Sequence, residues 1–143
     1  MLLASFFRFK QITVVIGCII FLSSCAQKIG FVTSSAVPAA EGQVKVKKDD
    51  NNNYSIKINM KNLAEPKRLT PSRSTYVVWM DSDGNGSKNL GQLKSSSGLF
   101  SSALKASLET TSPYKPKRIF ITAEDSGDIQ YPGTQVVLTT NTF

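Results

Sequence analysis

The chain has 143 residues, with 17 Lys and Arg against 10 Asp and Glu and no His, so its formal net charge is +7. This length is typical of a single domain. The absence of His excludes Ser-His-Asp and Cys-His catalysis and any zinc site that uses imidazole. The two Cys are too few for an all-thiolate zinc site. We therefore expect a protein that is not an enzyme.

Residues 1–24 have the composition of an export signal. Arg8 and Lys10 give a basic start, no acidic residue occurs, and the segment from Ile12 to Leu22 is apolar apart from one Thr, one Gly and one Cys. This apolar run has the length of a signal-peptide core. It is too short for a relaxed membrane span of about 20 residues.

The end of this segment, Leu22-Ser23-Ser24-Cys25, resembles the lipobox of bacterial lipoproteins. The resemblance implies that residues 1–24 are removed and that Cys25 becomes the lipidation site, with palmitate-type acyl chains. Two or more such chains anchor a protein stably, so the bilayer would be a partner through acylated Cys25. Cys18 would be discarded with the signal, which leaves no second thiol for a disulfide.

Removal of Arg8 and Lys10 would lower the net charge from +7 to +5. In lipoproteins of enteric bacteria, Asp after the lipidated Cys favours the inner membrane. Ala26 at this position indicates the outer membrane, with the domain facing the periplasm or the cell surface. An ordinary secretory signal and an uncleaved anchor helix are the alternatives to the lipobox interpretation.

Residues 25–41 form the lipidated Cys and a flexible tether in our prediction, because they are mostly small or polar and show no sustained period. Residues 42–143 form the folded domain. Its clearest signal is the strict alternation of Tyr54, Ile56, Ile58 and Met60 with polar residues, which predicts a strand with one buried face. Together with the alternating residues 43–47 and an Asn/Asp-rich turn, residues 43–61 predict a β-hairpin.

Further strands are expected after a loop at residues 62–74, and turn signals recur every 8–12 residues. They are predicted at 75–80, 88–94, 99–108, 118–123 and 134–140, with a helix as the alternative for 99–108. This spacing predicts an all-β, immunoglobulin-like antiparallel β-sandwich of about seven strands without a disulfide. Trp79 is typical of the buried core Trp of such domains.

A resemblance to a known family extends over residues 75–139. It is carried by Tyr76-Val-Val-Trp-Met80, Asn89-Leu-Gly-Gln-Leu93, Arg118-Ile-Phe-Ile-Thr-Ala-Glu124 and Tyr131-Pro-Gly-Thr-Gln-Val-Val-Leu138. These segments are similar to the extracytoplasmic domain of bacterial anti-sigma-K-type factors. The cytoplasmic sigma-binding segment and the membrane helix of that family have no counterpart here. The resemblance therefore implies the outer domain alone, and no sigma-factor binding.

Asp81, Asp83 and Asn85 occupy positions 1, 3 and 5 of an EF-hand-like loop, with Gly86 at position 6. Alternate oxygen ligands of this kind can wrap a calcium ion. Position 12 is Gln92 where the motif has Glu, and no helical period flanks the loop. A plain connection between two strands is the preferred interpretation, and a weakly bound calcium ion is the alternative.

Glu124, Asp125 and Asp128 form a second acidic turn, which we interpret as solvated rather than as an acid–base pair. Tyr114 and Tyr131 are predicted in loops, where rings can stack on sugars. Lys and Arg are spread along the chain without interleaved aromatic residues, so no nucleic-acid partner is expected. They either contact anionic headgroups or keep the strand edges soluble, and we favour the second interpretation.

The sequence thus predicts a membrane-anchored lipoprotein of the cell envelope. Its β-sandwich would be a non-enzymatic interaction or sensory module, with an envelope protein as a possible partner. The alternative is a ligand-binding sandwich for calcium or for glycans.

Overall fold

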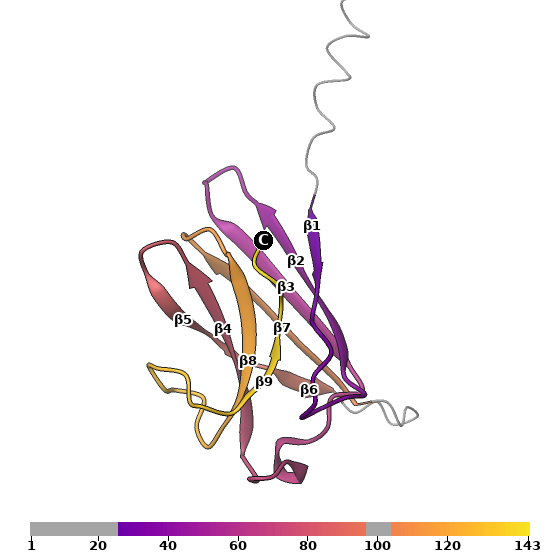
Figure 1. Ribbon diagram of the computed structural model, residues 1–143. Helices are drawn as coiled ribbons and strands as arrows, with labels where there is room; N and C mark the ends of the chain where they lie inside the picture. The colour runs from indigo at the N-terminus through magenta and orange to yellow at the C-terminus, as the bar shows by residue number, and fades with distance from the viewer. Residues whose placement is uncertain (1–25, 97–103) are drawn as a thin grey trace, which may run out of the picture.

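The computed structural model describes residues 26–96 and 104–143, and they form two antiparallel β-sheets packed face to face (Figure 1). The larger sheet has the order β1(Gln27–Gly30), β2(Glu41–Lys48), β3(Tyr54–Lys61), β7(Lys105–Ser112) and β6(Lys94–Ser96). The smaller sheet has the order β5(Gly86–Gln92), β4(Thr75–Ser82), β8(Arg118–Glu124) and β9(Val136–Thr139). A single 3-10 turn, η2(Pro66–Arg68), is the only helical element among the described residues.

This order is that of an immunoglobulin-like sandwich, as the sequence predicts. Strands β2, β3, β7 and β6 correspond to A, B, E and D, and strands β4, β8 and β9 correspond to C, F and G, with β5 beside C. No disulfide occurs in the described residues, which contain neither cysteine. The core is therefore held by packing alone.

The predicted hairpin is present as β2 and β3, which pair along their full length from Glu41–Lys61 to Lys48–Tyr54. The Asp49 carboxylate closes the connecting turn, because it accepts hydrogen bonds from the backbone N–H groups of Asn51 and Asn53 at 2.9 and 2.8 Å. Asn52 has a φ of 63°, a left-handed conformation that Asn tolerates. The Asn/Asp cluster thus performs the role expected from its sequence.

The described residues form nine strands, where the sequence suggests about seven. The predicted strand 88–94 is divided between the sheets, because Leu93 is buried and the chain passes there from β5 in the smaller sheet to β6 in the larger one. Strand β7 begins after residues 97–103 and continues to Ser112. The first part of the predicted segment 99–108 lies outside the described residues.

Strand β1 is the second addition, and it lies within the predicted tether. It pairs with β2, and the chain then crosses to the smaller sheet, where Phe31 bridges Thr140 and the N–H of Val32 donates to the carbonyl of Thr139 at 2.8 Å. Ile29 and Phe31 pack on the core and Val37 is buried. From Gln27 onward, the expected flexible segment 25–41 is therefore part of the folded domain, because its scattered apolar residues close one side of the sandwich.

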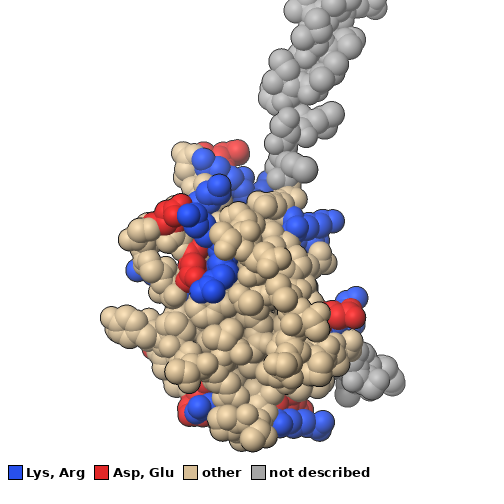
Figure 2. Space-filling model, viewed as in Figure 1, with Lys and Arg blue, Asp and Glu red and all other residues tan. Residues whose placement is uncertain are grey.

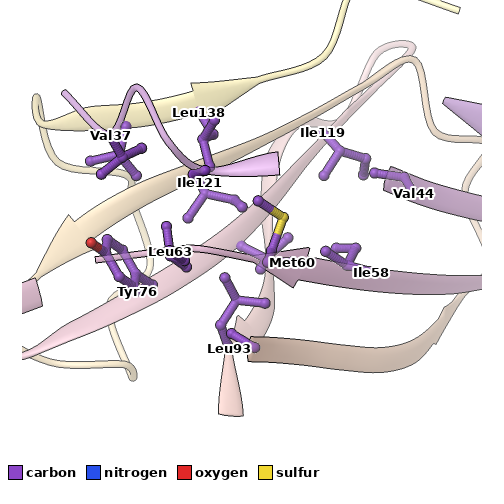
Figure 3. Packing of buried hydrophobic residues seen from close by; sticks show 14 of the residues in the cluster. Val37, Val44, Ile58, Met60, Leu63, Tyr76, Leu93, Ile119, Ile121 and Leu138 are labelled. Carbon is purple, nitrogen blue, oxygen red and sulfur yellow. The ribbon is translucent and has the colours of Figure 1, made fainter. Parts of the chain in front are cut away.

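The core between the sheets is contributed by alternate residues of both. Ile56, Ile58 and Met60 of β3 face Ile119 and Ile121 of β8, and Figure 3 shows the labelled members converging between the two layers. Several of these side chains have no exposed surface. Full burial of such a side chain contributes about 1.5–3 kcal/mol, so this layer is the main source of stability.

Trp79 is buried, but it does not lie in this core. Tyr76, Val78 and Met80 of β4 face the other sheet, so Val77 and Trp79 point to the opposite side. There they form a second cluster with Phe120, on the outer face of the smaller sheet. The prediction that Trp79 corresponds to the core Trp of immunoglobulin domains is therefore wrong, because Trp79 lies outside the core between the sheets. Because β4 is apolar on both faces, its pattern does not reveal which face carries the Trp.

Candidate ligand-binding groove

The predicted calcium ligands lie in the β4–β5 hairpin. Asp81 is the penultimate residue of β4, while Asp83 and Asn85 belong to the turn, which is completed by Gly84 and Gly86 at φ values of 70° and 63°. The Asn85 side-chain amide donates to the carbonyl of Asp83 at 2.8 Å. The glycines and this bond are typical of a tight connection between strands.

The two carboxylates are already engaged by cations. The Arg118 guanidinium contacts Asp81 at 2.6 Å and 2.8 Å, and Ser87 donates to the same carboxylate at 2.7 Å. Lys117 pairs with Asp83. Within residues 26–96 and 104–143 no group of three or more acidic or Cys side chains gathers as a metal site. A calcium ion here would have to displace Arg118 and Lys117, so the geometry favours the strand connection.

The long β8–β9 loop, residues 125–135, folds over the outer face of the smaller sheet. Asn89 of β5 holds it, because its side-chain amide donates to the carbonyls of Gly127 at 3.0 Å and Ile129 at 2.8 Å. The side chain of Ile129 packs on the cluster of Trp79 and Phe120. No pattern in the sequence indicates that Asn89 or Ile129 holds this loop, since each contributes a single side chain without a periodic signal.

The far end of this loop is fixed by the second acidic turn. Glu124 is buried, and its carboxylate accepts the N–H of Gly133 at 2.8 Å. Asp125 pairs with Arg73 at 2.7 Å, while Asp128 is exposed. The three carboxylates are therefore not brought together, and in the structure Glu124 and Asp125 bind protein groups.

Between this loop and β5 lies an open groove of about 540 Å³. Most of its lining side chains are polar, and Tyr131 supplies the one aromatic ring. The lining side chains are those of Asn85, Ser87, Lys88, Asn89, Gln130, Tyr131 and Pro132. Tyr131 is 80% exposed, more than any other large hydrophobic side chain in the described part of the chain. Amide and hydroxyl groups beside an exposed ring can bind a polar ligand with an apolar face, which is the chemistry of a sugar.

A second, smaller cavity of about 140 Å³ lies next to η2. Tyr76 lines it, and its hydroxyl donates to the carbonyl of Ala64 at 2.8 Å. Burial raises the pKa of Tyr76 to about 12, so this phenol stays neutral. Its lining combines apolar residues such as Leu63 and Leu93 with the ionisable side chains of Glu65 and Lys105.

The other predicted site residues are not collected in the groove. Cys25 lies outside the described residues. Tyr114 is 42% exposed and belongs to the β7–β8 connection, away from the residues that line the groove with Tyr131. The described residues contain no helix long and apolar enough to cross a membrane.

Comparison with known proteins returned no family model that matches the chain, and no match among curated proteins or solved structures.

Proposed function

We propose that the chain is a lipid-anchored, non-enzymatic binding module of the cell envelope. The observation that carries this proposal is the position of β1, which starts at Gln27, two residues after the candidate lipidation site Cys25. An acyl anchor at Cys25 would hold the whole sandwich at the bilayer surface. The sandwich would then present its loops and sheet faces to an envelope partner.

The anchor is tested by Cys25→Ser. We expect the wild-type protein in the membrane fraction with three acyl chains detectable by mass spectrometry, and the variant in the soluble fraction. Cys18→Ser is the matched control, because it removes the other thiol and leaves the lipobox intact. Unchanged membrane fractionation of Cys25→Ser would contradict the proposal.

A glycan is the second candidate ligand, favoured by the exposed Tyr131 in the groove. Stacking of a sugar ring on an aromatic face, with nearby amides to accept and donate hydrogen bonds, supports such binding. On a glycan array, Tyr131→Ala is expected to lose any hit shown by the wild type. Tyr114→Ala, which removes an exposed ring elsewhere, is expected to keep it, and an array without hits would remove the glycan candidate.

The resemblance to anti-sigma-K-type outer domains supports a sensory role of the same module, carried on a lipid anchor. A sigma-factor gene next to the coding gene would strengthen that role. Calcium is the weaker ligand candidate because of the cations that face Asp81 and Asp83.

A further inference from the structure

The outer face of the five-stranded sheet collects most of the lysines that appear scattered in the sequence. Buried positions alternate along each strand, so the intervening residues point away from the core. The register then places charged side chains on this outer surface, which we call the lysine face: Lys28, Lys45, Lys47, Lys57, Lys61, Lys94, Lys105, Glu41 and Glu109.

The lysine face accounts for the whole charge excess of the described residues. Its seven Lys and two Glu give a net charge of +5. The described residues carry 15 Lys and Arg and 10 Asp and Glu, because only Arg8 and Lys10 lie outside them. The remaining eight basic and eight acidic residues cancel, so the rest of the surface is neutral on balance.

Like charges lie directly opposite one another on this face. Lys28 is the partner of Lys45, and Lys45 is the partner of Lys57, in one row across three strands. Only Lys57 has an acidic partner in the row, Glu109 at 2.9 Å. Lys61 lies between Lys105 on one side and Glu41 on the other. Like charges in opposed positions destabilise a sheet, and an anionic surface relieves that cost.

Protection of sheet edges does not account for this arrangement. Lys residues that block strand addition belong on edge strands. Here Lys45, Lys57 and Lys61 are paired with a strand on both sides, and only Lys28 and Lys94 lie on the edge strands β1 and β6. The sequence interpretation, which favoured edge protection, is not supported by these positions.

The N-terminal end of the described chain determines what the lysine face can meet. In Figure 1, β1 is an edge strand of this sheet, and Figure 2 shows Lys and Arg, interspersed with Asp and Glu, at the same end and along the right-hand margin, with mainly uncharged surface over β8 and β9. Cys25 is three residues from Lys28, at most about 10 Å in extended chain. That reach is close to the Debye length of about 8 Å at physiological ionic strength.

We propose that the lysine face lies flat on an anionic phospholipid bilayer, an orientation that rests on the lipid anchor of the proposed function. The alternative, an end-on orientation, would bring the β2–β3 turn to the same headgroups, where Asp49 and Asp50 offset the positive charge of Lys47 and Lys48. The flat orientation brings seven Lys to the phosphates and no large apolar side chain. It leaves the groove at Tyr131, on the opposite sheet, facing away from the membrane.

The first test uses sedimentation with vesicles and residues 25–143, the chain expected after removal of the signal, with Cys25→Ser. We expect binding to vesicles that contain phosphatidylglycerol, little binding to phosphatidylcholine alone, and loss of binding near 1 M salt, where the Debye length is about 3 Å. Each Lys at an anionic surface contributes about five-fold to binding, so Lys47→Glu/Lys61→Glu/Lys105→Glu is expected to weaken it at least about 100-fold.

The matched control is Lys67→Glu/Lys88→Glu/Lys115→Glu, which changes the net charge equally at exposed positions outside the lysine face. It is expected to lose far less binding than the face variant. Equal losses in the two variants would overturn the proposal, as would equally tight binding of soluble polyphosphate. Melting temperatures near that of the wild type would show that both triple variants are folded. If they are not, the same positions are tested with the milder Lys→Gln substitutions.

The second test reads the orientation of the lipidated protein on vesicles. Ser107→Cys lies on the lysine face, and Tyr131→Cys lies on the groove. Phosphatidylglycerol should slow thiol labelling of Ser107→Cys several-fold and leave Tyr131→Cys unchanged. Equal labelling of both would overturn the flat orientation. A failed anchor is recognised separately, because mass spectrometry would then show no acyl chains while the vesicle sedimentation still tests the face.

Discussion

The two outer faces of the sandwich differ in polarity and in how they are covered. The outer face of the five-stranded sheet is polar, and its charges are mostly Lys opposite Lys or neutral residues. The outer face of the four-stranded sheet is apolar at Val77, Trp79 and Phe120, and the β8–β9 loop covers it. Its charged residues are balanced, as in the pair of Asp81 and Arg118.

The difference shows which outer face is covered by residues of the chain itself. The central strands β4 and β8 of the four-stranded sheet are buried on both faces, so the outer cluster is a small second core on which the loop packs. The five-stranded sheet leaves a net positive charge exposed on the lysine face. An external anionic surface can neutralise this charge. The following changes test this contrast, from the largest expected effect to the smallest.

Trp79→Ala should cause the largest loss of stability. The Trp79 ring has no exposed surface, stacks with Phe120 at a centroid distance of 6.4 Å, and donates from Nε1 to Thr122 Oγ1 at 2.8 Å. Removal of a buried Trp costs about 3–5 kcal/mol. Urea unfolding measures this loss of stability, and Trp79→Phe is the conservative control because it keeps an aromatic ring at the position. A loss under about 1 kcal/mol would mean that the outer cluster does not act as a core.

Asn89→Ala should loosen the β8–β9 loop and leave the side chains of the Trp79 cluster unchanged. Its amide donates to the carbonyls of Gly127 and Ile129, and its side-chain oxygen accepts the N–H of Gly91 at 2.8 Å. Leaving such partners unsatisfied costs about 1–3 kcal/mol. We expect faster hydrogen exchange in residues 125–135 and little change in β2 and β3. Exchange that rises equally in both sheets would instead indicate general destabilisation.

Asp81→Ala tests whether the hairpin is a connection or a metal site. Loss of the contacts with Arg118 and Ser87 should lower the free energy of unfolding by about 1 kcal/mol. Because these contacts are made within the protein, we expect the same loss with calcium and with chelator. A calcium-dependent rise in melting temperature that Asp81→Ala and Asp83→Ala abolish would restore the calcium hypothesis.

The hairpin of β2 and β3 was predictable because both of its signals are local. Alternation over Tyr54, Ile56, Ile58 and Met60 determines which face is buried, and the Asp49 turn determines the register. The all-β class and the sandwich followed from strand spacing. The same alternation also places Lys45 and Lys57 on one side of their strands, but their clustering depends on the pairing register and appears only once the sheet is formed.

Other features depend on contacts that are distant in the sequence. Trp79 lies in a strand without alternation, so only the path of the β8–β9 loop decides which side is covered. Segment 27–40 resembles a tether by composition, yet the isolated apolar residues Phe31 and Val37 fill gaps that the two sheets create. The groove likewise arises where β5 meets Gln130 and Tyr131, residues far apart in the chain.

Lys45→Glu has the smallest predicted effect on stability, and its sign is the informative part. Lys45 lies between Lys28 and Lys57, so the substitution replaces two like-charge oppositions with two favourable ones. Pairs of this kind contribute about 0.2–1 kcal/mol, so we expect the isolated protein to become more stable by that amount at low salt. The gain should fade as salt is added. Denaturant midpoints at two ionic strengths measure it, and Lys88→Glu is the control outside the lysine face. Since the same substitution should weaken binding to anionic vesicles, stability and binding would change in opposite directions. A loss of stability with Lys45→Glu would show that the lysine row is not under electrostatic strain.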